Sequence, residues 1–198
     1  MYVLYRMHPV FVGRHLKSLP TNHLTVGSVN KEYVVKPIKL SIRLNTLADL
    51  IEDGAAVIDV GSDHGYLPVH LAQKGTSKRI IASDISAASL SAARRSADNF
   101  NLTEAITFLV VPGLDGINPT DVDTIVISGM GGETIVSILE DAPWVNHSGM
   151  NLILQPQSKR NILFRFLYDN EYEIIKTIPV TDKKKQYIII QATGRKQS

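Results

Sequence analysis

The sequence predicts an α/β protein built on a doubly wound, mostly parallel β-sheet. Short apolar runs, each too short for a buried helix, alternate with segments that have helical periodicity. Glycine-rich loops follow several of these runs, as is typical where parallel strands end at a ligand site. The last two runs are separated by a short polar segment and predict an antiparallel hairpin. We therefore expect a seven-stranded sheet that ends in an antiparallel hairpin.

The first half of the regular region has clear element boundaries. Gly54 and Gly75 follow helical patterns and are expected to end them, whereas Ser86 is a suitable N-cap. The run from Ala56 to Val60 is uniformly apolar apart from Asp59, as in a strand buried on both faces. The expected elements are a helix over 40–51, a strand over 56–60, a helix over 66–73, a strand over 79–84 and a helix over 86–99.

The second half continues the alternation of strands and helices. Ser158 is expected to cap the last helix, which Asp169 and Asn170 end. Trp144 and His147 are expected to anchor a loop. The expected elements are strands over 106–111 and 124–127, a helix from 132 to about 141, a strand over 152–154, a helix over 158–168, and a hairpin of strands 172–180 and 186–193.

The composition excludes several classes of protein. Hydrophobic residues make up 44% of the 198 residues, which is enough for a core, and no apolar run approaches the ~18 residues of a membrane span. The chain has no cysteine, which excludes disulfides, thiolate catalysis and cysteine-ligated metal centres and fits a reducing compartment. The first residues do not resemble a signal peptide, because Arg6, His8 and Pro9 interrupt them. We expect a cytoplasmic monomer without a metal site.

Charge is distributed unevenly along the chain. The formal net charge of +2 divides into +5 for residues 1–39, −8 for residues 40–175 and +5 for residues 176–198. Residues 1–39 carry five proline and glycine residues and keep no regular period, so they form either a poorly ordered basic extension or a basic arm that touches nucleic acid. Residues 40–198 form the folded domain. The basic ends are candidate contacts for an anionic partner.

The loop after the first strand carries the first candidate site. Gly61 and Gly65 allow a tight turn and a close backbone approach to a ligand. The loop is not G-x-G-x-x-G, and the carboxylates of Asp59 and Asp63 would repel a dinucleotide pyrophosphate. They suit a cationic ligand such as S-adenosylmethionine. The alternative is an ordinary glycine turn capped by Asp63.

Three later loops complete the expected edge of the sheet. Asp84 ends the second strand, where an acid accepts hydrogen bonds from ribose hydroxyls; its alternative role is to cap the next helix. The segment from Val111 to Gly116 could cover an adenine ring or form a plain turn. The glycines of 129–132 could admit a planar base, or allow close packing of strand and helix.

The chain resembles the bacterial tRNA (adenine-22-N1)-methyltransferases. The resemblance covers residues 40–193 and rests on Leu-Ser-Ile-Arg-Leu at 40–44, Asp-Val-Gly-Ser-Asp-His-Gly-Tyr-Leu-Pro at 59–68, the segment 123–132 with its Gly-Met-Gly-Gly, and Leu-Ile-Leu-Gln-Pro at 152–156. It implies a Rossmann-like class I methyltransferase that uses S-adenosylmethionine to methylate N1 of an adenine in tRNA. The departures are Val111-Pro112 where the family has Gly-Asp, Gln157 where it has Asn, and an end at Ser198 where it continues into a helical domain.

The loops and the resemblance together assign roles to individual residues. The expected reaction is direct attack of the adenine N1 lone pair on the cofactor methyl, governed by alignment. The basic residues of the last hairpin are expected to contact RNA. The cofactor residues are Asp59, Gly61, Ser62, Asp63, Gly65, Asp84, Ile85, Gly113, Leu114 and Ser128; the reaction-centre residues are Asp63, His64, Gly129, Met130 and Gly131; the substrate residues are Arg43, Tyr66, Gly132, Lys183, Lys184 and Lys185.

Other functions fit parts of the same sequence. One alternative is a relative that binds S-adenosylmethionine or RNA without turnover, and another is a methyltransferase for a different RNA or a small molecule. A third is an NAD-dependent oxidoreductase, which the acidic first loop disfavours.

Overall fold

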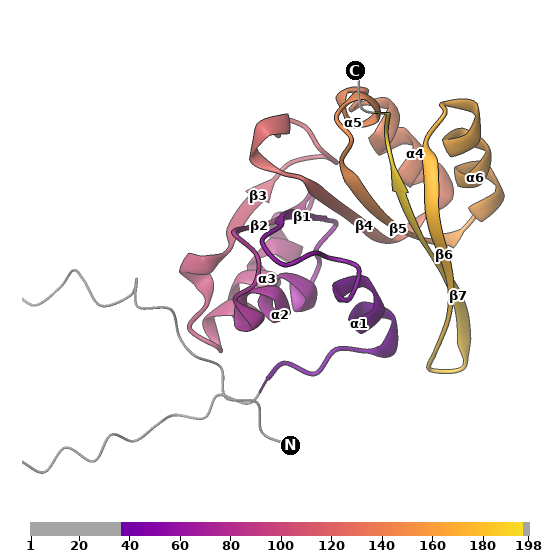
Figure 1. Ribbon diagram of the computed structural model, residues 1–198. Helices are drawn as coiled ribbons and strands as arrows, with labels where there is room; N and C mark the ends of the chain where they lie inside the picture. The colour runs from indigo at the N-terminus through magenta and orange to yellow at the C-terminus, as the bar shows by residue number, and fades with distance from the viewer. Residues whose placement is uncertain (1–36, 196–198) are drawn as a thin grey trace, which may run out of the picture. The chain divides into compact units, whose positions relative to one another are not determined.

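The computed structural model describes residues 37–195, and within them seven strands form one sheet in the order β3-β2-β1-β4-β5-β7-β6 (Figure 1). The strands from β3 to β5 are parallel, and β7 runs antiparallel to both β5 and β6. This confirms the predicted Rossmann-like sheet. The strands are β1 (Ala56–Val60), β2 (Arg79–Asp84), β3 (Thr107–Val110), β4 (Thr124–Gly131), β5 (Asn151–Ser158), β6 (Glu173–Asp182) and β7 (Lys185–Thr193).

The helices begin and end largely at the residues that the sequence indicates, except that the first helix ends at Ala48 and not just before Gly54. The Ser86 hydroxyl accepts a hydrogen bond from the Ser89 amide at 3.2 Å, and Gly75 ends its helix in the left-handed region at φ +68°. The helices are α1 (Ile42–Ala48), α2 (Tyr66–Lys74), α3 (Ala87–Asp98), α4 (Gly132–Glu140), α5 (Trp144–His147) and α6 (Arg160–Asp169), with the 3₁₀ turns η2 (Thr103–Ala105) and η3 (Pro119–Asp121).

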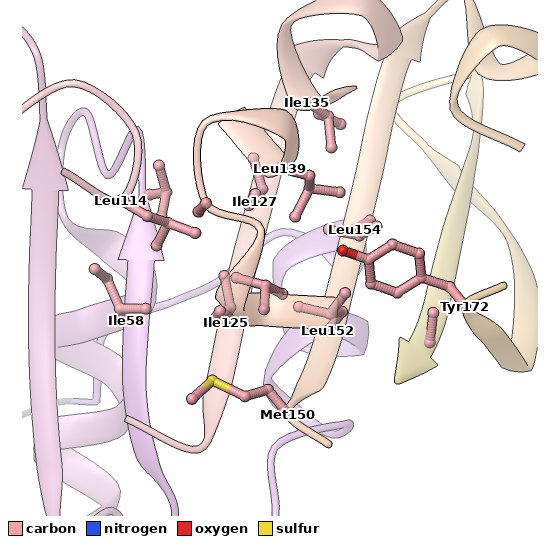
Figure 2. Packing of buried hydrophobic residues seen from close by; sticks show 14 of the residues in the cluster. Ile58, Leu114, Ile125, Ile127, Ile135, Leu139, Met150, Leu152, Leu154 and Tyr172 are labelled. Atoms are coloured by element: carbon pink, nitrogen blue, oxygen red, sulfur yellow. The ribbon is translucent and has the colours of Figure 1, made fainter. Parts of the chain in front are cut away.

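The core has two halves, one on each face of the sheet. Because side chains alternate along a strand, Ile125 and Ile127 face one half and Val126 faces the other. The first half packs against α4 and α6 through residues such as Ile135 and Leu163, and Figure 2 shows its centre around β4 and β5. The second half packs against α1, α2 and α3. Both faces of the central strands are therefore buried, which explains their uninterrupted apolar sequences.

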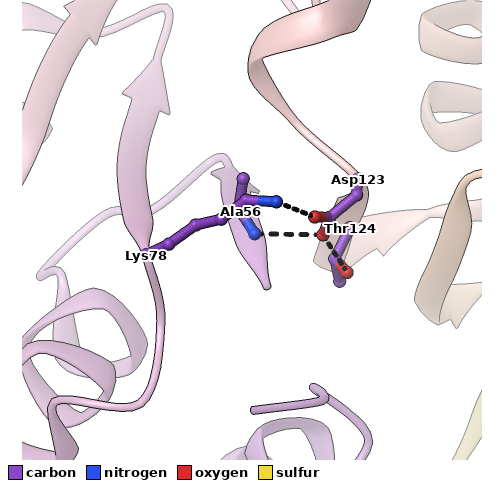
Figure 3. A network of polar contacts seen from close by, with 4 residues as sticks. All are labelled: Ala56, Lys78, Asp123 and Thr124. Atoms are coloured by element: carbon purple, nitrogen blue, oxygen red, sulfur yellow. Dashed lines mark hydrogen bonds and ion pairs between the residues drawn. The ribbon is translucent and has the colours of Figure 1, made fainter. Parts of the chain in front are cut away.

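A polar clamp holds the amino-terminal edge of the sheet together. The Asp123 carboxylate accepts hydrogen bonds from the Ala56 amide at 3.0 Å, the Thr124 hydroxyl at 3.1 Å and the Lys78 ammonium at 2.9 Å (Figure 3). The Asp123 carbonyl also accepts a bond from the Asn151 amide at 3.0 Å. One residue thus connects the starts of β1, β2, β4 and β5, at the edge opposite to the one where parallel strands end.

Two strands are longer than the sequence predicted. β4 continues through the glycine segment to Gly131, with a bulge between Ser128 and Met130, because β5 pairs with it along that length. The prediction that Ser158 caps the last helix is wrong: Ser158 ends β5, and Lys159 precedes α6 in the left-handed region. The expected loop around Trp144 is also wrong, since that residue begins α5.

The terminal hairpin turns on two lysines. Lys183 and Lys184 have φ angles of +46° and +66°, which fits the two-residue turn that matches strand twist. β7 begins beside this turn and runs antiparallel to β5, so the turn lies on the side where β5 ends (Figure 1). The three consecutive lysines therefore project from the carboxyl edge of the sheet.

The expected extension over 1–39 falls almost wholly outside the described residues. Within them, Ile38 belongs to the folded unit, since its amide donates a hydrogen bond to the Gln73 side chain at 2.7 Å. Across residues 37–195, no helix has both the length and the apolar character needed to cross a bilayer.

Candidate functional site

A cavity of about 630 Å³ opens where β1, β2 and β4 end. β1 and β4 are neighbours, and the chain continues from β1 to β2 on one side of the pair and from β4 to β5 on the other. The cavity therefore lies at the topological switch point of the sheet, where ligands bind in such folds. The cavity brings together six residues that the sequence selected from four separate loops. They are Gly61, Asp84, Ile85, Gly113, Leu114 and Met130.

Asp84 lies at the end of β2 with its carboxylate held by backbone groups. Oδ1 accepts a hydrogen bond from the Ser86 amide at 2.8 Å, and Oδ2 accepts one from the Asp63 amide at 3.3 Å. A carboxylate has about four acceptor positions, so roughly half of its capacity stays available toward the cavity. Both roles that the sequence left open are therefore compatible: Asp84 fixes two loops and can also accept bonds from a ligand.

The first glycine loop is folded back onto β2. The amides of Gly61 and Ser62 both donate to the Ser83 carbonyl, at 2.8 and 2.9 Å, and Gly61 has φ +73°. A Cβ at Gly61 would collide with the Met130 methyl group. The bare backbone of Gly61 and the flexible Met130 side chain therefore share one part of the cavity wall.

Asp59 lies beneath this loop and does not line the cavity. Its carboxylate is buried and accepts a hydrogen bond from the Ser62 hydroxyl at 2.8 Å. Burial raises the pKa of Asp59 to about 7, the Ser62 bond and the Arg43 guanidinium act in the opposite direction, and Asp84 adds a smaller increase. Asp59 and Ser62 thus support the loop from behind.

Asp63, His64 and Tyr66 lie together on an exposed surface beside the loop. The rings of His64 and Tyr66 are stacked with centroids 5.6 Å apart, and His64 Nε2 is 3.7 Å from the Asp63 carboxylate. The Asp63 and His64 side chains are 68% and 56% exposed. None of the three lines the cavity. Their placement suits contact with a large substrate better than contact with an enclosed cofactor.

Two of the selected glycines are required by packing. A Cβ at Gly65 would stand 2.8 Å from the Ala93 Cβ, so this glycine allows α2 and α3 to approach each other. A Cβ at Gly132 would overlap the Lys159 carbonyl, so that glycine allows α4 to begin beside the end of β5. The close-packing alternative therefore holds for Gly132. By contrast, a Cβ at Gly131 would make only ordinary contact, at 3.4 Å from the Ser158 hydroxyl.

A second polar cluster adjoins the bulge of β4. Gln155 is fully buried, and its Oε1 accepts hydrogen bonds from Arg43 Nη1 at 2.7 Å and from the Gly129 amide at 3.2 Å. The Arg43 guanidinium also lies 5.6 Å from the centroid of the Tyr187 ring. Ser128 pairs with Gln155 across the two strands. Arg43, Ser128 and Gly129 are thus brought together around Gln155, and Met130 of the cavity wall follows Gly129.

Some residues of the site were not selected from the sequence. The α4 side chains that line the cavity show only helical periodicity in the sequence, which does not mark them as ligand contacts. The one available signal is that α4 directly follows the glycine segment and therefore begins beside the switch point. Gln155 belongs to the Leu-Ile-Leu-Gln-Pro motif at 152–156, but its central position in the polar cluster depends on tertiary contacts. The lining residues that the sequence did not indicate are Val60, Thr134, Ser137, Ile138, Asp141 and Ala142, whereas Val111, Pro112 and Asp115 belong to the loop segment expected to cover an adenine ring.

The charge of the cavity wall is negative. The lining includes the carboxylates of Asp84, Asp115 and Asp141 and no Lys or Arg within the described part of the chain. The remainder is largely apolar, with Ile85, Leu114 and similar side chains. Residues 37–195 contain no group of three or more His, Asp or Glu side chains arranged for a metal ion. The wall therefore offers acceptors for hydroxyl groups, a favourable field for a cation and apolar surface for a ring.

Comparison with known proteins places this cavity in a family. A family model described as a methyltransferase domain matches residues 40–190. The tRNA (adenine(22)-N(1))-methyltransferase of Bacillus subtilis is 33% identical over 155 residues, which cover 78% of this chain and 65% of that protein. A putative tRNA methyltransferase of Mycoplasma pneumoniae is 33% identical over 153 residues, which cover 75% of this chain and 68% of that protein. The chain thus spans about two thirds of these relatives.

A solved structure supports the same grouping. The putative tRNA (m1A22) methyltransferase of Streptococcus pneumoniae, in complex with S-adenosyl-L-methionine, matches with a TM-score of 0.75 and 32% identity. The match covers 81% of this chain and 75% of that one. Sheet order, cavity position and sequence similarity therefore agree. The chain belongs to the methyltransferase domain family, and its relatives in that family include the bacterial tRNA (adenine-22-N1)-methyltransferases.

Proposed function

We propose that this protein uses S-adenosylmethionine to methylate N1 of an adenine in tRNA, of the position-22 type. The observation that carries the proposal is the acidic, partly apolar cavity at the switch point. A sulfonium and an ammonium group are stabilised by such a wall, whereas the pyrophosphate of NAD would face three carboxylates without a basic partner from residues 37–195. The complex of the Streptococcus pneumoniae relative with S-adenosyl-L-methionine supports this choice.

The residues present fit this cofactor. Asp84 has free acceptor capacity for a ribose diol, and the apolar side chains of Ile85, Leu114 and Ile138 can enclose an adenine ring. A Cβ at Gly113 would stand 3.2 Å from Ile138, so the glycine keeps this part of the wall open. S-adenosylmethionine would supply an electrophilic methyl group, and these residues would hold the molecule that carries it.

The target adenine needs alignment rather than activation. Its N1 has a free lone pair at neutral pH, so no side chain has to remove a proton before the attack. The chain's task is to hold the base in line with the methyl group, which is the contribution of positioning. A base in a folded RNA must leave its stack to reach such a site, at a cost of a few kcal/mol. The exposed backbone of Gly129 and the adjacent Met130 form the surface onto which it would move.

The carboxyl edge of the sheet offers basic groups for RNA. Lys183, Lys184 and Lys185 project from the hairpin on the side where β5 ends, and Lys159 and Arg160 follow β5 directly. Phosphate contacts of this kind position nucleic acid and make binding depend on salt. The proposed RNA contacts would then lie on the same edge of the sheet as the cavity, which supports the proposal. A tRNA substrate also implies a cytoplasmic location, and the cavity is formed by one chain, so a monomer would suffice.

Methyl transfer to defined transcripts tests the proposal. The full chain is incubated with S-adenosylmethionine labelled in its methyl group and an unmodified tRNA that carries adenine at position 22; the control transcript carries guanine there. We expect label only in the adenine transcript, and a large excess of NAD should not inhibit. Equal labelling of both transcripts would contradict the proposed position, and labelling of neither would contradict the proposed function.

A further inference from the structure

We propose that Gln157 selects the target base by pairing its side-chain amide with N6 and N7 of the adenine. The inference rests on the proposed function and deepens it, because it assigns base specificity to one residue of the same site. It also explains how N1 stays free for reaction while the base is held.

Gln157 and Gln155 lie on the same face of β5 but have different surroundings. Gln155 is fully buried, and its amide is used by Arg43, by the Gly129 amide and by the Pro156 carbonyl, to which it donates at 2.9 Å. The side chain of Gln157 is exposed and makes no hydrogen bond with any group in residues 37–195. Gln155 therefore fixes the local structure, whereas the amide of Gln157 is available to a ligand.

Gly129 lies between the Gln157 amide and the Arg43 guanidinium. Gly129 has φ +80° and is exposed, and a Cβ placed on it would be in van der Waals contact with both groups, 3.7 Å from Gln157 Nε2 and 4.0 Å from Arg43 Nη1. The bare glycine thus brings an amide and a guanidinium close to the same piece of exposed backbone. The Gln155 bonds and the Tyr187 ring hold that guanidinium in place. Arg guanidinium planes are surfaces on which an unstacked base can stack.

The chemistry of an amide selects adenine at this position. A glutamine side chain donates to N7 and accepts from the N6 amino group of adenine, and this pairing on the Hoogsteen edge does not use N1. Guanine presents two acceptors, N7 and O6, so the amide oxygen would face O6 without a proton between them. Met130 follows Gly129 and lines the cavity, so a base held by Gln157 beside Gly129 would lie next to a residue of the cavity wall.

A base analogue separates this role from a structural one. We would compare kcat/KM for tRNA transcripts that carry adenosine or 7-deazaadenosine at the target position, since 7-deazaadenosine lacks only the N7 acceptor. For the wild-type chain we expect the analogue to react about 3- to 10-fold more slowly, as is typical for loss of one neutral hydrogen bond. For Gln157→Ala, which removes both bonds, we expect a loss of about 10- to 100-fold with adenosine and no further loss with the analogue.

Two further variants complete the experiment. Gln157→Glu places a second acceptor opposite N7, so this variant should react better with 7-deazaadenosine than with adenosine. Gln186→Ala removes another exposed glutamine, on the neighbouring hairpin, and should keep the full sensitivity to the analogue. A wild-type chain that methylates both transcripts equally, or a Gln157→Ala variant that stays as sensitive as wild type, overturns the assignment. Methylation of neither transcript would instead contradict the proposed function.

Discussion

Replacing Asp84 by Asn should weaken the binding of S-adenosylmethionine without unfolding the protein. The Asp84 carboxylate has about four acceptor positions, of which the Ser86 and Asp63 amides use two. Two positions are left for the two hydroxyls of a ribose. Asparagine keeps only one acceptor oxygen, so at least one hydroxyl loses its partner and the remaining bond loses its charge.

The size of the effect follows from the number of bonds lost. A hydrogen bond to a charged group contributes about 1.5–3 kcal/mol, so Asp84→Asn should cost about 2–3 kcal/mol of binding free energy. This corresponds to a dissociation constant raised roughly 30- to 150-fold. Isothermal titration calorimetry on the full chain measures it directly, and the melting temperature of the free variant shows whether the loops keep their structure.

S-adenosylhomocysteine distinguishes ribose binding from charge attraction. It carries the same ribose but no sulfonium, so a carboxylate that binds the diol should matter equally for both molecules. We therefore expect the same loss of affinity for S-adenosylhomocysteine as for S-adenosylmethionine. A variant that binds S-adenosylhomocysteine as well as wild type does, or binds S-adenosylmethionine within threefold of wild type, would refute the assignment of Asp84 to the ribose.

Three other predictions follow from the same geometry. Because burial raises the pKa of Asp59 to about 7, the folded chain keeps a proton that the unfolded chain releases near pH 4, and the free energy of unfolding should fall by up to about 4 kcal/mol between pH 4 and 7. Chemical denaturation of Asp59→Asn should not show this fall; an equal fall in the variant and in wild type would contradict the prediction. Gly131→Leu should fold with a normal melting temperature but lose methyl transfer, whereas Gly132→Ala should lose stability because its Cβ meets the Lys159 carbonyl. A Gly131→Leu variant that still transfers methyl groups would count against a role for Gly131 at the reaction centre. Asp123→Ala removes two partly buried hydrogen bonds and an exposed ion pair, so the free energy of unfolding should fall by about 1–2 kcal/mol and the melting temperature by roughly 3–6 °C. The affinity for the cofactor should not change; weaker cofactor binding would show that the polar clamp acts on the site.

The fold was predictable because its signals are local. The run of β1, apolar apart from Asp59, the Ser86 cap and the terminal glycine of α2 each specify one element without reference to the others. The errors occurred where tertiary pairing overrides local preference. Gly129 and Gly131 break a strand pattern in sequence, but pairing with β5 extends β4 through them. Ser158 is a good cap by residue type, yet the same pairing keeps it in β5.

The site was predictable only in part, for a related reason. Asp84 and Gly61 were selected because loops after parallel strands meet at one edge, and both do line the cavity. Asp59 and Gly65 follow the same rule in sequence, but Asp59 lies beneath the loop and Gly65 allows two helices to pack closely. Which side of a loop a residue faces depends on what packs behind it. The roles of Gln155 and Gln157 depend on contacts across strands and are not visible in a single sequence.

The measurement that tests the central claim most directly is the identity of the methylated nucleoside. Unmodified tRNA incubated with the full chain and S-adenosylmethionine is digested to nucleosides and analysed by mass spectrometry against standards. We predict N1-methyladenosine in an amount that approaches one per tRNA and that is lost when adenine 22 is replaced by guanine. Absence of N1-methyladenosine, or its persistence in the guanine-22 transcript, would contradict the proposed reaction at this site.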